Sequence, residues 1–170
     1  DGKDEYYIFY TDGGGIGYVR GDSPVGPWHD DLGQKMFTSK SEGCEGVKWC
    51  FDPAVLADDK GNAYIYFGGG NDEEKYVQTG RVCKLKFEKG TGIVSPDGIP
   101  KTLNTFCFFE DGEINQIDGK YIYSYCTNWD VKEDTPYVGA VQIAAYVSSD
   151  PMNICFFPDK IGKTKFTDEE

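Results

Sequence analysis

The sequence is short of positive charge and of long apolar runs, and each shortage argues against a class of protein. Its 170 residues carry 17 basic and 29 acidic side chains, which gives a formal net charge of −12 at pH 7. This balance argues against a phosphate backbone or an anionic membrane surface as a partner. No stretch approaches the roughly 20 apolar residues that a membrane helix needs. We therefore expect neither nucleic acid nor a membrane among the partners.

Motifs for metal and nucleotide binding are also missing. The sequence has six cysteines: Cys44, Cys50, Cys83, Cys107, Cys126 and Cys155. They form no CxxC pair, so we expect no metal site of this kind. Several lie in apolar strand-like runs, which favours free thiols with at most one bridge, between Cys44 and Cys50. The glycine-rich segment after Asp12 has no phosphate-loop pattern, and the only histidine, His29, is expected in a solvated turn.

Aromatic residues and glycine are abundant. The chain has 12 tyrosines, 11 phenylalanines and 22 glycines, and alanine or leucine runs of helical period are scarce. This composition predicts an all-β protein, and the length predicts a single domain, residues 1–170. The first residue is Asp1 rather than methionine, so we expect a processed form or a piece of a longer protein.

One pattern occurs three times along the chain. A polar turn with a glycine (Gly2, Gly61 or Gly119) is followed by an aromatic strand-like run, and each copy is followed by a second such run, at residues 17–20, 81–87 and 144–148. Aromatic hairpins repeated at a long, nearly constant period are typical of β-propeller blades. A twisted multi-hairpin sandwich would give similar strand spacing and is the alternative.

The repeat predicts about three blades: residues 1–57, 58–115 and 116–157, with a frayed tail at 158–170. Propellers typically close with roughly four to eight blades. We therefore expect a further polypeptide segment or chain to complete the ring.

Two acids stand out as candidates for chemistry. In the stretch from Thr105 to Tyr125, Glu110 follows two phenylalanines. A carboxyl in that place is partly desolvated, which raises its pKa and suits a general acid. We predict strand, acidic turn over residues 110–113, hairpin at Asp118–Gly119 and strand. Glu113 is the rival acid, although a solvated turn residue is the preferred interpretation.

The second candidate is Asp52, which lies between Phe51 and Pro53 at the start of an apolar run. An aspartate before proline often only caps a turn. However, Asp52 precedes Gly61 by the same number of residues as Glu110 precedes Gly119. If equivalent positions on neighbouring blades converge on the propeller axis, both carboxyls face one pocket.

The segments FDPAVLADDKGNAYIYFGG and FFEDGEINQIDGKYIYSY, with GIGYVRGDSPVGPW before them, resemble glycoside hydrolase family 43. These five-bladed propellers include β-xylosidases, α-L-arabinofuranosidases and arabinanases, and the resemblance covers about residues 5–153. It implies that Glu110 is the general acid and that Asp52 tunes the pKa and orientation of this acid. The aspartate that acts as base in the family lies on its first blade, N-terminal to the matched region, so we name no base in this chain.

The resemblance implies an inverting glycosidase that acts on arabinose- or xylose-containing hemicellulose, an oligo- or polysaccharide substrate. Trp49, Phe51, Asn128 and Trp129 are candidate sugar contacts. A non-catalytic carbohydrate-binding propeller and an endo-arabinanase are the alternatives. No cofactor is expected to be required, and a structural Ca²⁺ ion in the central channel is left open. We expect a secreted protein, with a cytoplasmic one as the alternative.

Overall fold

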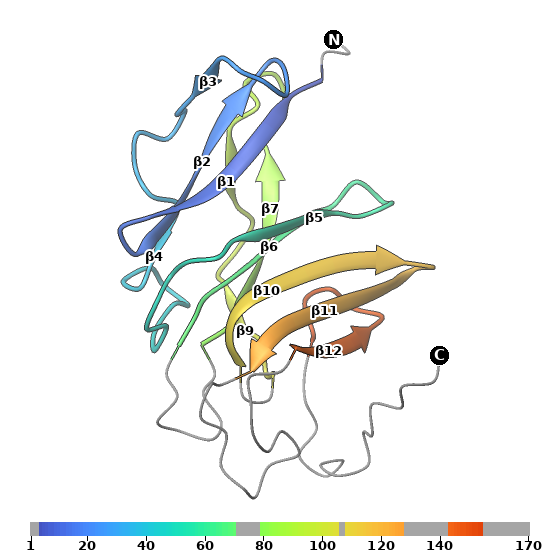
Figure 1. The fold of residues 1–170 in the computed structure, drawn as a ribbon. Helices are drawn as coiled ribbons and strands as arrows, with labels where there is room; N and C mark the ends of the chain where they lie inside the picture. Colours follow the sequence, from blue (N-terminus) through green and yellow to red (C-terminus); the bar gives the residue numbers. More distant parts are fainter. Residues whose placement is uncertain (1–3, 71–78, 106–107, 128–142, 155–170) are drawn as a thin grey trace, which may run out of the picture.

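The structure is a computed structural model, and it describes residues 4–70, 79–105, 108–127 and 143–154. The described residues form three antiparallel sheets (Figure 1). The first sheet contains β1 (Tyr6–Asp12), β2 (Gly15–Gly21), β3 (Trp28–His29) and β4 (Phe37–Thr38). The second contains β5 (Ala54–Ala57), β6 (Ala63–Phe67), β7 (Arg81–Phe87), β8 (Val94–Pro96) and β9 (Lys101–Thr102). The third contains β10 (Phe108–Ile117), β11 (Lys120–Thr127) and β12 (Ile143–Ser148).

The predicted all-β class is confirmed. The aromatic runs after the turn glycines Gly61 and Gly119 are β6 and β11, and the run near the start of the chain is β1. The second runs lie in β2, β7 and β12. Each pair is hydrogen-bonded as antiparallel neighbours, so the repeat in the sequence corresponds to a repeat of β-hairpins.

The sheets divide the chain at other places than the predicted segments. β5 lies before residue 58 yet pairs with β6, and most of β10 lies before residue 116 yet pairs with β11. The physical reason is that the turn glycine lies inside a hairpin, so a strand of the same sheet precedes it. The predicted tail, residues 158–170, lies outside the described residues.

The acidic segment, residues 110–113, is not a turn as predicted but part of β10. The strand accommodates it through register shifts against β11 between Phe108 and Glu110 and between Glu110 and Glu113. Asp111 has a left-handed backbone conformation there, with φ of 53°. Shifts of this kind are β-bulges, which bend a strand without ending it. The predicted hairpin at Asp118–Gly119 is confirmed, because Ile117 pairs with Lys120.

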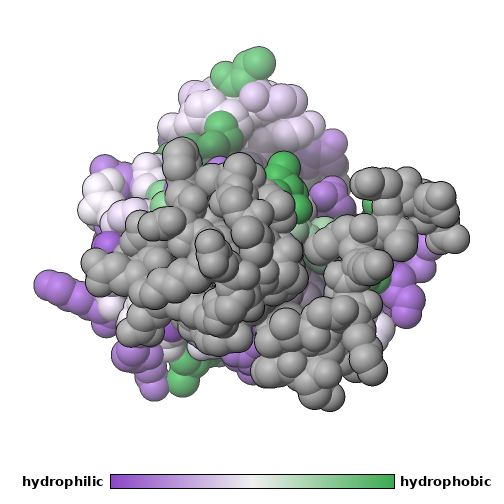
Figure 2. All heavy atoms as spheres, turned by 60° about the horizontal axis from the view of Figure 1, so that its bottom comes forward, coloured by the Kyte–Doolittle hydropathy of each residue, from purple (hydrophilic) through white to green (hydrophobic). Residues whose placement is uncertain are grey.

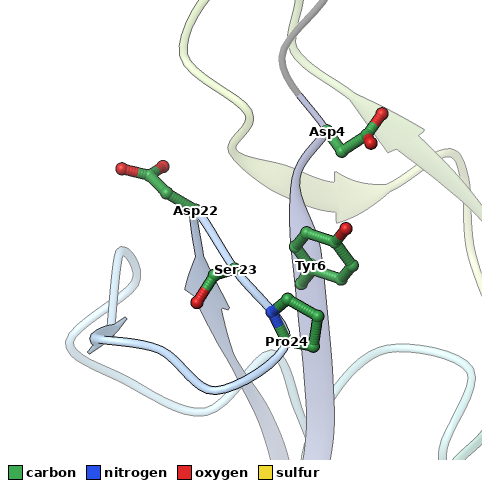
Figure 3. A pocket seen from close by; sticks show the side chains of 5 residues that line it. All are labelled: Asp4, Tyr6, Asp22, Ser23 and Pro24. Atoms are coloured by element: carbon green, nitrogen blue, oxygen red, sulfur yellow. The ribbon is translucent and has the colours of Figure 1, made fainter.

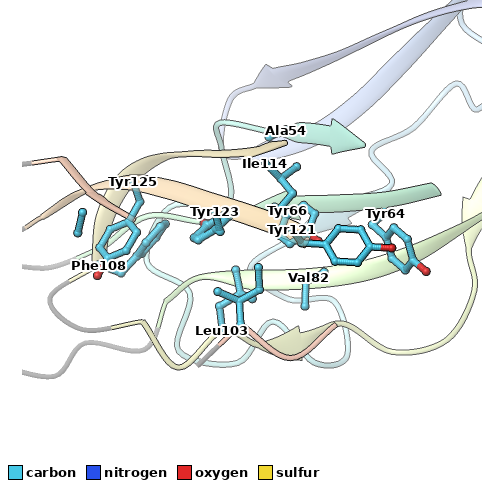
Figure 4. Close-up of a cluster of buried hydrophobic side chains, with 12 residues drawn as sticks. Ala54, Tyr64, Tyr66, Val82, Leu103, Phe108, Ile114, Tyr121, Tyr123 and Tyr125 are labelled. Atoms are coloured by element: carbon cyan, nitrogen blue, oxygen red, sulfur yellow. The ribbon is translucent and has the colours of Figure 1, made fainter. Parts of the chain in front are cut away.

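The second sheet separates two hydrophobic cores, and β6 is buried on both faces. Ala63, Ile65 and Phe67 of β6 belong to the core shared with the first sheet. Tyr64 and Tyr66 belong to the core shared with the third sheet (Figure 4). This alternation follows from the period of two along a strand, and it explains why a run of five residues without a charge lies in the middle of the molecule.

Tyrosine hydroxyls connect neighbouring sheets. The hydroxyl of Tyr18 in β2 accepts a hydrogen bond from the Val94 N–H in β8, at 2.8 Å. The Tyr121 hydroxyl in β11 donates to Asp58 Oδ2 at 3.2 Å, next to β5. Buried tyrosine hydroxyl groups usually have such partners. The high tyrosine content therefore serves both to fill the cores and to join the sheets.

The described cysteines are free thiols. Cys44, Cys50 and Cys83 are buried and Cys126 is half-buried, so the bridge between Cys44 and Cys50 is not formed. The other two cysteines, at positions 107 and 155, lie outside the described residues. Across the part of the chain that the structure describes, no helix is long and apolar enough to cross a membrane.

Candidate active site

Asp52 lies immediately before β5, where segments of all three sheets meet. Its N–H donates a hydrogen bond to Thr11 Oγ1 in β1, at 3.1 Å. Its carboxylate oxygen Oδ2 accepts a hydrogen bond from the Asp111 N–H in β10, at 3.4 Å. Asp52 has φ of 49°, a left-handed conformation that is uncommon outside glycine. A side-chain hydroxyl of the first sheet and a main-chain N–H of the third sheet therefore hold this residue on both sides.

The surroundings of Asp52 favour the neutral form of its carboxyl group. Burial is the main cause that raises its pKa, and the negative charge of Asp111 beside it acts in the same direction. The hydrogen bond from the Asp111 N–H opposes them, because it stabilises the carboxylate. The net shift is upward.

Glu110 lies in β10, directly before Asp111, and is half-buried. It pairs with Cys126 of β11 across the bulge. The preceding Phe108 is fully buried, as expected for a residue that anchors the strand in the core. The rival acid Glu113 is exposed and pairs with Ser124. The structure therefore brings the segment that carries Glu110 against Asp52, and it leaves Glu113 facing solvent.

An aromatic cluster borders this place. Trp49 is 40% exposed and makes edge-to-face contacts with Phe51 and Phe109, with ring centroids 5.6 and 5.8 Å apart. The Phe51 ring covers Gly69, where any side chain would collide with it. Of the predicted sugar contacts, Trp49 and Phe51 thus lie together next to Asp52. The other two, at positions 128 and 129, lie outside the described residues.

Sequence reasoning missed three residues that contact or adjoin the acids. Thr11 precedes Asp52 by 41 residues in the sequence. No local sequence pattern therefore connects the two residues. Asp111 was not singled out because residues 110–113 were predicted to form an acidic turn. Cys126 was missed because an unbroken register from the Ile117–Lys120 pair would place Thr127 opposite Glu110. The glycine at position 112, inside an acidic strand, was the available signal of a bulge.

The thiol of Cys126 extends the acidic group. Its Sγ donates a weak hydrogen bond to Asp111 Oδ2, at 3.9 Å. Burial raises the pKa of this thiol, and the charges of Asp111 and Glu110 raise it further. A thiol in these surroundings stays protonated at neutral pH and acts as a donor to the carboxylate.

Two hollows lie near the first sheet. One, of about 350 Å³, is lined by Asp4, Tyr6, Asp22, Ser23 and Pro24 at the end of β1 remote from Thr11 (Figure 3). The other, of about 270 Å³, includes Tyr10 and Asp12, which flank Thr11 in the sequence. Figure 2 shows the end of the molecule where β10 begins and β11 ends. The described residues around the edge of this face are mostly hydrophilic, with small separate hydrophobic patches.

Metal-binding groups are not assembled in this part of the molecule. Within residues 4–70, 79–105, 108–127 and 143–154, no group of three or more histidine, cysteine or acidic side chains is arranged to hold a metal ion.

Known proteins are similar to this chain in sequence and in fold. The family model described as Glycosyl hydrolases family 43 matches residues 1–127. The chain belongs to glycosyl hydrolases family 43. Within this family, an arabinoxylan arabinofuranohydrolase of Paenibacillus polymyxa is 37% identical over 174 residues, which cover 98% of this chain and 27% of the relative.

Solved structures of family 43 proteins have the same fold. An arabinoxylan arabinofuranohydrolase from Bacillus subtilis, in complex with cellotetraose, matches 90% of this chain and 32% of its own, with 36% identity and a TM-score of 0.80. An α-L-arabinofuranosidase from Clostridium thermocellum matches 88% of this chain and 45% of its own, with 33% identity and a TM-score of 0.70. The chain thus spans less than half the length of each of these relatives.

Proposed function

We propose that this family 43 protein hydrolyses arabinose- or xylose-containing hemicellulose, as an α-L-arabinofuranosidase or a β-xylosidase. The observation that carries the proposal is the 3.4 Å contact between the Asp111 N–H and Asp52 Oδ2, because it holds the segment with Glu110 against a second carboxyl group. Glycoside hydrolysis requires carboxyl groups arranged around one bond. The names of the relatives from Paenibacillus polymyxa and Clostridium thermocellum support an arabinose-bearing substrate.

In the proposed reaction, Glu110 donates its proton to the glycosidic oxygen while the bond from that oxygen to the anomeric carbon breaks. A carboxylate from a further segment or chain takes a proton from water, and the water oxygen bonds to the anomeric carbon from the opposite face. The configuration at that carbon is therefore inverted. Ionised Asp52 opposes the loss of the Glu110 proton by like-charge repulsion. Glu110 therefore stays protonated until it donates the proton to the glycosidic oxygen.

The described surroundings fit this reaction. The exposed Trp49 offers an aromatic surface next to Asp52, and sugar rings stack on such surfaces. In this proposal the three sheets are blades of a five-bladed β-propeller, and the segment or chain that supplies the base also completes the ring. The reaction needs no cofactor, and a polysaccharide substrate favours secretion.

The decisive experiment compares Glu110→Gln with Glu113→Gln in the intact protein. Glutamine cannot donate the proton, so hydrolysis of arabinoxylan, whose leaving group is poor, should fall by about 10²–10⁴-fold in Glu110→Gln. Aryl arabinofuranosides and aryl xylosides with good leaving groups need less protonation and should lose less activity. Glu113→Gln should retain the wild-type rates.

Two results would overturn the proposal. One is a loss of activity in Glu113→Gln while Glu110→Gln remains active. The other is a wild-type protein that binds arabinoxylan but cleaves neither the polysaccharide nor the aryl glycosides, which would establish a carbohydrate-binding protein without catalysis.

A further inference from the structure

A carboxyl group without an assigned role, that of Asp111, lies beside Asp52. The β-bulges in β10 place Asp111 at φ of 53°, so that its N–H points toward the neighbouring sheet. The acceptor of this N–H is Asp52 Oδ2, at 3.4 Å. Aspartate tolerates this left-handed conformation better than most residues but at a cost relative to extended backbone.

Each member of this pair is held in place by a further contact. The N–H of Asp52 donates to the Thr11 hydroxyl at 3.1 Å, and Asp52 itself has φ of 49°. On the other side, the Cys126 thiol donates to Asp111 Oδ2 at 3.9 Å. Residues from β1, β10 and β11 thus form one chain of contacts through the two aspartates.

We propose that Asp111 is a positioning residue of this site: its N–H holds the Asp52 carboxylate beside the Glu110 segment, and its own negative charge acts on Asp52 from β10. The catalytic meaning of this inference rests on the proposed function. The contacts between these residues do not depend on that function. Asp111 acts through Asp52 and is not assigned contact with substrate.

The effect of Asp111 on Asp52 follows from the charges at the site. Two neighbouring carboxylates repel each other, so the charge of Asp111 disfavours ionisation of Asp52. Burial and the charge of Asp111 both raise the pKa of Asp52. While Asp52 is protonated, it repels charge on Glu110 less strongly than when it is ionised. The charge of Asp111 therefore affects the proposed general acid through the protonation of Asp52.

Other polar and charged groups around the pair come from each neighbouring element. β10 contributes Glu110, and β11 contributes the half-buried thiol of Cys126. β1 contributes the neutral hydroxyl of Thr11. The loop before Asp52 contributes Lys48, whose Nζ lies 5.1 Å from the centre of the Trp49 ring. These groups are left unchanged by the variants below.

The test is a ¹³C NMR titration of the aspartate carboxyl carbons in the 170-residue chain, with the Asp52 signal assigned by its loss in Asp52→Asn. In the wild type, we expect the Asp52 midpoint above the ordinary value of about 3.9. In Asp111→Asn, the Asp52 midpoint should shift to lower pH by roughly tenfold in proton concentration, because the neighbouring negative charge is removed.

Asp118→Asn is the matched control, because Asp118 is an exposed aspartate at φ of 50° in the turn at the other end of β10. It should leave the Asp52 midpoint unchanged. If Asp111→Asn does not fold, Asp111→Gly removes the carboxylate while it keeps the N–H and suits the left-handed backbone. An Asp52 midpoint that does not move in the Asp111 variant, or that moves equally in the control, overturns the proposal.

This result is separate from the proposed function. If the titration shifts as expected but the wild-type intact protein cleaves no glycoside, the aspartate pair exists and the catalytic assignment fails. If the intact protein is active and the Asp52 midpoint is the same in all variants, the glycosidase proposal stands and the role of Asp111 is rejected.

Discussion

The β5–β6 and β10–β11 hairpins place an acid at the same distance from a turn glycine, yet they are built differently. In the first, Ala57 pairs with Ala63, and residues 58–62 form a long turn. In the second, Ile117 pairs with Lys120, so the turn has two residues and the strand is longer. The register shifts of β10 lie within this longer strand. Equal spacing in the sequence thus corresponds to a regular strand in one sheet and a bulged strand in the other, and the bulge directs a main-chain N–H toward Asp52.

The largest effect is expected from a change in the bulge itself. A Cβ atom at Gly112 would collide with the hydroxyl of Tyr123, which is fully buried. The Tyr123 ring is stacked on Tyr66 and Tyr125, at centroid distances of 5.4 and 5.9 Å, so it has no room to move. We expect Gly112→Ala to lower the free energy of unfolding by about 1–3 kcal/mol, measured by urea denaturation.

Tyr123→Phe provides the control for this collision. In the part of the chain that the structure describes, the Tyr123 hydroxyl has no hydrogen-bond partner, so its removal should change stability little. The double variant Gly112→Ala/Tyr123→Phe should recover part of the lost stability. If the hydroxyl makes no difference to the cost of Gly112→Ala, the collision is not the cause.

A smaller effect, dependent on pH, is expected in the long turn of the other hairpin. Asp58 accepts hydrogen bonds from the N–H groups of Asn62 and Lys60, at 2.7 and 3.0 Å, and from the Tyr121 hydroxyl. Burial opposes ionisation of Asp58, but the hydrogen bonds from Asn62, Lys60 and Tyr121 outweigh it and lower the pKa. Such a carboxylate stabilises the fold above the unfolded pKa of about 3.9, and this stabilisation is lost as the pH falls through the lower, folded pKa.

Asp58→Asn should therefore have a lower urea midpoint than the wild type at neutral pH, with a difference that narrows below about pH 4. Asp118→Asn, in the two-residue turn, is the control with the same substitution, and it should match the wild type more closely. If the urea midpoints of Asp58→Asn and the wild type differ by the same amount at all pH values, the lowered pKa of Asp58 does not contribute to stability as assigned.

The smallest effect concerns the reactivity of Cys126, which lies opposite Glu110. It is the least buried of the four described cysteines, so iodoacetamide should label it before Cys44, Cys50 and Cys83 in the native protein. Because burial and nearby carboxylates raise its pKa, the labelling should be slow, and Asp111→Asn should accelerate it a few-fold. Peptide mapping by mass spectrometry measures both rates. Earlier labelling of a buried cysteine, or no acceleration in the variant, would contradict this arrangement.

Much of the fold follows from local patterns in the sequence. Turn glycines followed by aromatic strands correctly predicted β6 and β11, because both signals are local. The division into sheets was misplaced because a short strand such as β5, with only AVLA, carries little pattern of its own. The bulge was read as a turn, because acidic residues and Gly112 are typical of turns and only pairing with β11 keeps them in a strand.

Apolar neighbours in the sequence were enough to single out Asp52 and Glu110 as candidates, and the structure places the segment of Glu110 against Asp52. The site was not predictable where it rests on contacts between sheets. Thr11 and Asp111 reach Asp52 from β1 and β10, and these approaches depend on how three sheets are placed relative to one another. Spacing along the chain contains no such information.

The burial of β6 on both faces has a consequence for how the molecule unfolds. Its side chains belong alternately to the two cores, so the strand cannot detach from one core without leaving the other. The halves of the molecule on either side of β6 should therefore unfold together as one cooperative unit. The amide hydrogens of β6 should be among the slowest to exchange with solvent, because only global unfolding exposes them.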